Sequence, residues 1–192
     1  MSKPLFLLAS TSAYRRELAA RLHLPFEVAN PQVDETAIPG ESPPQRAQRL
    51  SLAKARAVAQ RHRHALVVGS DQVAALGERI LHKPRDAESC RRQLAALAGH
   101  TASFYTGCAL VHPHGTQTYL DTTSVVFRTL TPEEIERYVA AEQPFDCAGG
   151  FKAEGLGIAL FERIDSADPS ALIGLPLIWL AGALRAAGLQ VP

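Results

Sequence analysis

The chain has 192 residues, of which 46% are hydrophobic and 20% charged, a composition typical of a soluble globular protein that can bury a core. Its 20 basic and 19 acidic side chains nearly cancel, so it lacks the basic excess of a nucleic-acid scaffold. No apolar stretch approaches the length of a membrane span, and the apolar run at residues 5–9 is too short for the core of a secretory signal. We therefore expect neither nucleic acid nor membrane as a partner, although a few local cations would suffice to bind a single nucleotide.

The three cysteines, Cys90, Cys108 and Cys147, are scattered along the chain and form no CxxC pair. This usage favours a reducing, cytoplasmic location and provides no zinc site. The histidine pairs at positions 62/64 and 112/114 lie in polar, loop-like surroundings, and we interpret them as surface residues.

The first half of the chain alternates short apolar runs with amphipathic segments. The predicted elements here are strands at 5–9 and 26–29, a strand that ends near Asp71, and helices at 12–23 and 42–60. Ser42-Pro43-Pro44-Gln45 is typical of a helix start, because serine suits the N-cap, proline the first turn and glutamine the capping-box position.

The second half predicts a hairpin among further helices. The predicted elements are a turn near Gly77, a small strand into Lys83-Pro84, helices at 86–97, from 131 and at 176–187, and strands at 104–111, 118–127 and 159–164. His112-Pro113-His114-Gly115 joins the two longer strands, which should pair antiparallel in the centre or at one edge of the sheet. The alternation predicts an α/β fold with a mixed, twisted central sheet flanked by helices. Because no linker interrupts the chain, we expect a single domain over residues 1–192 with two lobes.

A buried-strand pattern leads directly into an acidic residue at position 71. Leu66, Val67 and Val68 form an apolar run that is followed by Gly69 and, two residues later, by Asp71. In open α/β sheets, ligands gather beyond the carboxyl ends of strands, so Asp71 is placed to hold a metal ion or to activate water. The same local pattern also fits an aspartate that only caps the turn after a strand.

Hydroxyl and basic residues gather where the first strand meets the first helix. Ser10 and Ser12, with Arg15 one turn into the helix, favour an anion site built from hydroxyls, backbone N–H groups and a guanidinium. The alternative is simple capping by Ser12 beside solvated arginines.

Further polar residues occur at intervals along the chain. Asp34 and Glu35 form a carboxylate pair in a loop, and Lys54 lies on an otherwise apolar helix face, where a lysine often extends its amine to solvent. Lys83 follows Asp71, and the glycine-rich segment 146–157 either permits close approach to a ligand or is an ordinary surface loop. Carboxylates for a divalent cation, together with arginine and lysine for phosphate oxygens, are the groups that phosphoryl transfer requires. The sequence contains no P-loop, dinucleotide fingerprint or nucleophile elbow.

These residues together resemble the Maf family of nucleotide pyrophosphatases over nearly the whole chain. The residues that carry the resemblance are, in order, Leu8-Ala9-Ser10-Thr11-Ser12 with Arg15, Asp34-Glu35, Lys54, Gly69-Ser70-Asp71, Lys83-Pro84, the glycine-rich segment and Gly174-Leu175-Pro176. One departure is Ala13, where many members carry proline. The resemblance implies the fold of the inosine-triphosphate house-cleaning enzymes, with two lobes and a cleft between them.

Three positions resemble the subgroup of the family that hydrolyses 7-methyl-GTP, namely Tyr14, Gln72 and Glu154. The subgroup acting on dTTP and UTP typically has Arg, Thr and Gln there. Methylation at N7 gives guanine a positive charge, so an aromatic face and a carboxylate suit it better than another cation. Tyr14 would stack on the base, or serve only in packing, and Glu154 would accept from the N1–H and the exocyclic amine.

The resemblance implies hydrolysis between the α- and β-phosphates of a nucleoside triphosphate. Asp71 would be the general base or would place the attacking water, and Glu35 with Asp71 would hold Mg²⁺ or Mn²⁺. The residues implied to bind the phosphates are Ser10, Ser12, Arg15, Lys54 and Lys83.

Two alternatives stay open. One is a sister specificity, for dTTP and UTP or for other non-standard nucleotides such as those of inosine. The other is a nucleotide-sensing regulator of cell division without turnover. A homodimer is common among the proteins that the chain resembles.

Overall fold

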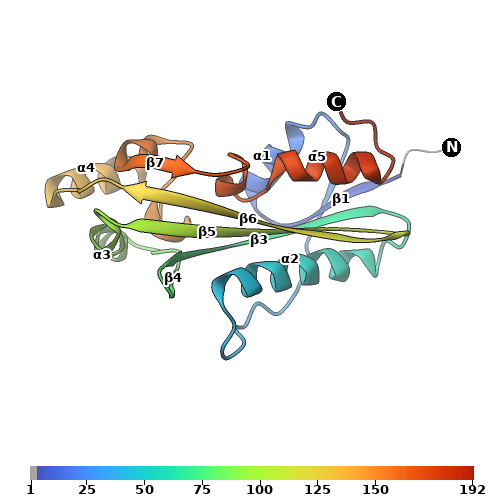
Figure 1. Cartoon of the computed structure of the whole chain (residues 1–192), viewed down its shortest axis with the longest axis horizontal. Helices are drawn as coiled ribbons and strands as arrows, with labels where there is room; N and C mark the ends of the chain where they lie inside the picture. The colour runs from blue at the N-terminus through green and yellow to red at the C-terminus, as the bar shows by residue number, and fades with distance from the viewer. Residues whose placement is uncertain (1–3) are drawn as a thin grey trace. The chain divides into compact units, whose positions relative to one another are not determined.

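The computed structural model describes residues 4–192, and Figure 1 shows its helices and strands in chain order. Seven strands form one sheet in the order β2-β1-β3-β5-β6-β7, with β4 paired to β3, which confirms the mixed α/β fold. The chain divides into two compact units, and β3, β5 and β6 run from one unit into the other. The first unit comprises Met1–Gln72, Tyr105–Asp121 and Asp168–Pro192, and the second comprises Val73–Phe104 and Thr122–Ala167.

The first unit is built on parallel strands. Its elements are β1 (Phe6–Ala9), α1 (Ala13–Ala20), β2 (Glu27–Ala29), α2 (Pro43–Ala59), the first part of β3 (Leu66–Leu76), the adjoining parts of β5 (Thr101–His112) and β6 (Gly115–Phe127), the 3-10 turn η3 (Ala171–Ile173) and α5 (Leu177–Ala186). β1 pairs in parallel with both β2 and β3, so that Leu8 lies opposite Val28 on one side and Val68 on the other.

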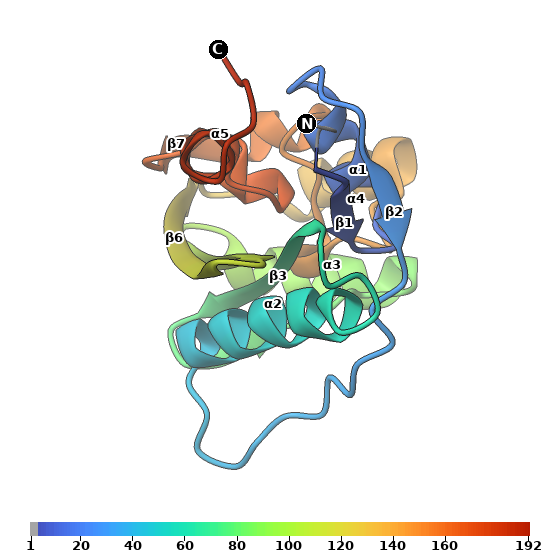
Figure 2. The ribbon, with the colours of Figure 1, turned by 90° about the vertical axis from the view of Figure 1, so that its right-hand side faces the viewer.

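Alternate side chains of these strands serve two separate apolar cores. Leu8 packs with Leu18 of α1 and Leu180 of α5, whereas Leu7 packs in a second cluster with Val58 of α2. Figure 2 shows the same division in the ribbon, with α2 on one side of β1 and β3 and with α1 and α5 on the other. Both faces are covered, as the continuous apolar runs of β1 and β3 require.

The second unit has an aromatic core. Its elements are the last part of β3, β4 (Arg79–Leu81), α3 (Ala87–Leu97), parts of β5 and β6, α4 (Pro132–Glu142), the 3-10 turns η1 (Ala148–Gly150) and η2 (Leu156–Leu160), and β7 (Phe161–Asp165). Phe104, Phe127, Phe151 and Phe161 meet edge to face, with ring centroids 4.9–5.4 Å apart. β4 pairs antiparallel with β3, and β7 pairs antiparallel with β6.

The helix starts follow the sequence signals closely. In α2, the Gln45 side chain accepts the Ser42 N–H at 2.9 Å, as the capping-box pattern predicts. In α4, Thr131 and Glu134 form the same box, and Asp86 caps α3 through the Ser89 N–H. The predicted hairpin is also present. β5 and β6 are neighbours inside the sheet, since β2 and β7 form its edges.

The predicted end of the strand at Asp71 was wrong, because β3 continues to Leu76. Gly69 does not terminate the strand; it lets α2 approach, since a β-carbon there would clash with the backbone of Ser51 and Ala55. Asp71 therefore belongs to the strand itself and does not cap a turn. Among the described residues, no helix is both long and apolar enough to cross a bilayer.

Candidate active site

Lys54 joins two carboxylates within the first unit. Its ammonium lies 2.6 Å from Asp71 Oδ1 on β3 and 2.8 Å from Glu35 Oε1 in the loop before α2. The side chains of Lys54 and Asp71 are only 8% and 11% exposed, whereas that of Glu35 is 55% exposed. Lys54 therefore does not extend to solvent, and the predicted set of Glu35, Lys54 and Asp71 forms one cluster.

This cluster suits a divalent cation in its donor chemistry. Carboxylate oxygens are hard ligands, and the two carboxylates each place an oxygen within 2.8 Å of the same Lys54 nitrogen. No group of three or more His, Cys, Asp or Glu side chains arranged for a metal occurs within residues 4–192. Mg²⁺ is commonly bound by one or two carboxylates, with water and substrate phosphates as its other ligands. Glu35 and Asp71 match that kind of site.

The start of α1 brings hydroxyl groups next to a guanidinium. Ser12 is the N-cap, its Oγ accepting the Arg15 N–H at 3.4 Å, and Ser10 Oγ accepts the Ser12 N–H at 3.1 Å. Arg15 Nε donates to Gly174 O at 2.8 Å, which fixes the guanidinium. Burial lowers the pKa of Arg15 from its ordinary value, and the charge of Asp71 counteracts this shift. Arg15 therefore lies in the electric field of the Lys54 cluster.

Gln72 is held by three acceptors. Its Nε2 donates to Thr106 Oγ1 at 2.9 Å and to the carbonyls of Ala171 and Leu172 at 3.0 Å each. Carbonyl oxygens can only accept, so the amide nitrogen must face them and Oε1 points to the other side of the amide. Tyr14, the first-unit residue predicted to meet the base, lies half-buried on α1.

The loop around η3 holds several of these side chains in place, a role that the sequence did not predict. In this loop the carbonyl of Gly174 accepts hydrogen bonds from both Arg15 and Ser70, each at 2.8 Å. Gly174 has φ +126°, and a β-carbon there would lie 3.3 Å from Arg15 Nε, so this position favours glycine. Asp168 pins the loop by accepting the Ser170 N–H at 3.0 Å and the Ile178 N–H at 2.7 Å. Thr106 and Asp168 belong to no motif that the sequence analysis identified.

Lys83 and Glu154 belong to the second unit. Both are exposed, Lys83 just after β4 and Glu154 between η1 and η2. Within residues 4–192 the carboxylate of Glu154 makes no hydrogen bond or ion pair, while its neighbour Gly155 packs against Glu142. The roles predicted for these two residues rest on the family resemblance.

Comparison with known proteins gives a family for the whole chain. The model of the Maf-like protein family matches residues 5–187. The chain belongs to the Maf family. It is 54% identical to a 7-methyl-GTP pyrophosphatase of Xanthomonas campestris, over 98% of this chain and 99% of that one. It is also 55% identical to a 7-methyl-GTP pyrophosphatase of Polaromonas sp., over 99% of this chain and 87% of the relative.

Solved structures with low sequence identity share the fold of this Maf chain. A HAM1 protein from Coxiella burnetii matches with a TM-score of 0.52 and 15% identity, over 96% of this chain and 100% of that one. The Staphylococcus aureus Ham1 protein matches with a TM-score of 0.52 and 14% identity, over 95% and 98% of the two chains. These likenesses confirm the fold class expected from the sequence.

Proposed function

We propose that this Maf-family protein is a nucleoside triphosphate pyrophosphatase that hydrolyses 7-methyl-GTP to 7-methyl-GMP and pyrophosphate. The observation that carries the proposal is the cluster in which the buried Lys54 contacts both the buried Asp71 and the exposed Glu35. Charged groups buried with a specific partner are typical of catalytic sites. The names of the relatives that are more than half identical to the chain support the choice of reaction and substrate.

Asp71 is assigned the role of general base. Its carboxylate accepts a proton from the attacking water, the new bond forms between that oxygen and phosphorus, and the α–β anhydride bond breaks to release pyrophosphate. Being in the middle of β3 and bound to Lys54, the carboxylate is held in one place, which general-base catalysis requires.

Glu35 and Asp71 are proposed to hold Mg²⁺ or Mn²⁺. When bound, such an ion polarises phosphate oxygens and offsets the charge that develops on them. Lys54 stays close to both carboxylates and supplies a further positive charge, and Arg15 adds a fixed guanidinium from α1. Ser10 and Ser12 contribute hydroxyl donors, and Lys83 is proposed as a third phosphate-binding cation.

Base recognition is assigned to Tyr14, Gln72 and Glu154. The anchored amide of Gln72 turns one fixed acceptor, Oε1, away from the η3 loop. Such an acceptor suits the N–H donors of guanine, and the Tyr14 ring suits the positive charge of the N7-methylated base. The carboxylate of Glu154 is assigned to the N1–H and the exocyclic amine on the family resemblance.

The deciding experiment is a panel of nucleoside triphosphates with pyrophosphate detection, in Mg²⁺ and in Mn²⁺. We expect 7-methyl-GTP to give the highest kcat/KM and no release of pyrophosphate after chelation of the metal. Faster turnover of dTTP, UTP or inosine triphosphate would show that the substrate is one of these nucleotides and not 7-methyl-GTP. Tight binding of nucleotide with no pyrophosphate released would favour the nucleotide-sensing alternative.

Two further parts of the proposal concern the protein in the cell. We propose a cytoplasmic location, supported by three cysteines that form no disulfide, and a homodimer, by analogy with the family. Cell fractionation tests the first, and light scattering of the purified protein tests the second.

A further inference from the structure

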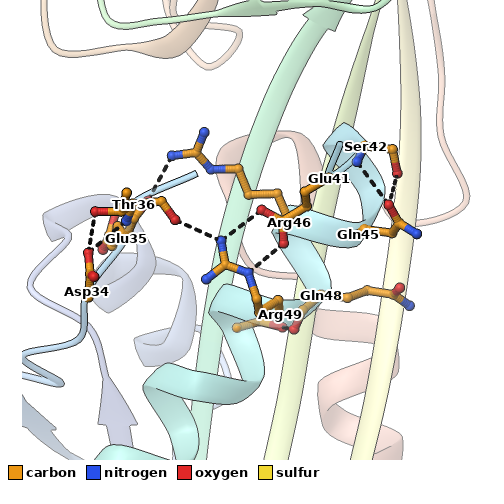
Figure 3. Close-up of polar contacts among 10 residues, drawn as sticks. Asp34, Glu35, Thr36, Glu41, Ser42, Gln45, Arg46, Gln48 and Arg49 are labelled. Carbon is orange, nitrogen blue, oxygen red and sulfur yellow. Dashed lines mark hydrogen bonds and ion pairs between the residues drawn. The ribbon is translucent and has the colours of Figure 1, made fainter. Parts of the chain in front are cut away.

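The loop that carries Glu35 is fastened to α2 by two arginines, as Figure 3 shows. Arg46 Nη2 donates to the carbonyl of Glu35 at 3.0 Å, and Arg49 Nη2 donates to the carbonyl of Thr36 at 3.2 Å. Arg46 and Arg49 are three residues apart and therefore lie on the same face of the helix. Two successive carbonyls of the loop are thus bound by side chains from one helix turn.

Arg49 also forms a two-point ion pair with Glu41 at the far end of the loop. Its Nε and Nη2 donate to the two carboxylate oxygens at 2.5 and 2.8 Å. The Glu41 side chain is only 8% exposed, so the pair is partly shielded from water. Paired bonds of a guanidinium to a carboxylate are the strongest and most directional ion pairs in proteins. Arg49 therefore ties residue 36 and residue 41 to one point on α2.

The loop has little else to fix its shape. Asp34 Oδ1 accepts from the Thr36 N–H at 2.9 Å and from its hydroxyl at 2.6 Å, which forms a local turn. The side chain of Glu35 is mostly exposed, so apolar packing does not hold it. Its carboxylate is positioned by Lys54, which belongs to the same helix as Arg49. Side chains of α2 thus bind both the backbone carbonyl and the carboxylate of Glu35.

We infer that Arg49 is a positioning residue, and that the Arg49–Glu41 latch holds Glu35 close enough to Asp71 for both carboxylates to bind one divalent cation. The inference rests on the proposed function, in which Glu35 and Asp71 are the metal ligands. Asp71 is fixed by β3 whether or not the latch is closed, whereas Glu35 depends on the loop. Breaking the latch should therefore weaken metal binding through Glu35 alone.

The test is a titration with Mn²⁺ alone, in which electron paramagnetic resonance measures the free ion. It compares wild type, Glu35→Gln, Arg49→Gln and the double variant. Groups that orient metal ligands typically change metal affinity by about 10- to 100-fold, and we expect Arg49→Gln to weaken Mn²⁺ binding by about tenfold. Because Arg49 acts through Glu35, the double variant should bind no more weakly than Glu35→Gln.

Two matched variants control for loss of charge and for general damage. Arg49→Lys keeps the positive charge but cannot form the two-point contact of the guanidinium, so its Mn²⁺ affinity should lie between those of wild type and Arg49→Gln. Arg91→Gln breaks a similar pair with Glu136 in the second unit and should leave Mn²⁺ affinity unchanged. Circular dichroism should show the same folded spectrum for every variant.

The possible outcomes distinguish the role of the Arg49–Glu41 latch from the role of Glu35 as a metal ligand. Wild-type affinity in Arg49→Gln, or losses in the double variant that add, would overturn the latch and leave the proposed function standing. Unchanged affinity in Glu35→Gln, or no Mn²⁺ binding by wild type, would overturn both the latch and the metal role of Glu35. The pyrophosphate panel decides the reaction itself independently of either result.

Discussion

The two units of the molecule differ in how deeply they bury charged side chains. The most deeply buried charged residues within residues 4–192, namely Lys54, Asp71, Asp121 and Asp168, all belong to the first unit. In the second unit the core is aromatic and the ion pairs are more exposed: the side chains are 24% and 19% exposed in Lys152–Glu142, and 40% and 55% exposed in Arg91–Glu136.

This difference in burial helps to distinguish a functional site from the parts of the fold that serve only stability. Burying an ion costs several kcal/mol of solvation, which attraction to a partner often fails to recover, whereas an exposed pair contributes about 0–1 kcal/mol. A fold selected only for stability has no need of a buried pair such as Lys54–Asp71. Its presence in the first unit favours a chemical role there, and the exposed pairs of the second unit favour none.

The largest expected effect tests the buried pair directly. Lys54→Met should lower the free energy of unfolding by about 3 kcal/mol, because it leaves the Asp71 carboxylate buried without its cation. Arg91→Met, which removes the exposed pair of the second unit, should cost less than about 1 kcal/mol. Urea unfolding at neutral pH measures both. Equal losses would show that the two kinds of pair do not differ in energy.

Asp71→Asn tests whether the buried carboxylate is chemical as well as structural. The amide keeps the shape of the side chain but loses its basicity and its affinity for a cation. We expect kcat for pyrophosphate release from 7-methyl-GTP to fall by at least roughly a hundredfold. Asp165→Asn, at an exposed ion pair with Arg163, is the matched control and should retain wild-type kcat. Near-normal turnover in Asp71→Asn would remove this residue from the mechanism.

Glu154 in the second unit is exposed, and within the described part of the chain its carboxylate has no hydrogen bond or ion pair. Replacing its carboxylate by a neutral amide weakens charge-assisted hydrogen bonds by about 1.4 kcal/mol, which is tenfold. Glu154→Gln should therefore lower kcat/KM about tenfold for 7-methyl-GTP and less for GTP, because the base of GTP offers the same N–H donors but lacks the positive charge that the carboxylate would attract. Equal losses for the two substrates would argue against recognition of the methylated base by this residue.

The sequence predicted local structure well where one residue type is needed for a physical reason. Ser42 with Gln45 forms the expected capping box, the helix predicted from residue 131 has Thr131 as its N-cap, and the strand predicted at 5–9 is confirmed over Phe6–Ala9. The end of β3 was missed because Gly69 was interpreted as a terminator, when it is a point of close helix packing.

Long-range contacts were the part that local patterns could not predict. Lys54 looked like a solvated lysine, and only the pairing of β1 with β3 and the packing of α2 on them bring it to Asp71. Arg49 and Glu41 carried no motif at all, since their importance lies in a contact across a loop. The family resemblance, rather than the local pattern, supplied the grouping of Glu35, Lys54 and Asp71.

The smallest expected effect concerns the pH dependence of the latch. The hydrogen bond from Arg49 lowers the pKa of Glu41 below its ordinary value of 4.5, so the folded protein holds this carboxyl in its charged form more readily than the unfolded chain does. The contribution of the latch to stability should be full above pH 4.5 and should be lost as the pH falls through the lowered value. The difference in unfolding free energy between wild type and Glu41→Gln should accordingly be constant near neutral pH and shrink in acid. A difference that stays constant down to pH 3, well below the ordinary value, would mean that the charge of Glu41 does not stabilise the loop.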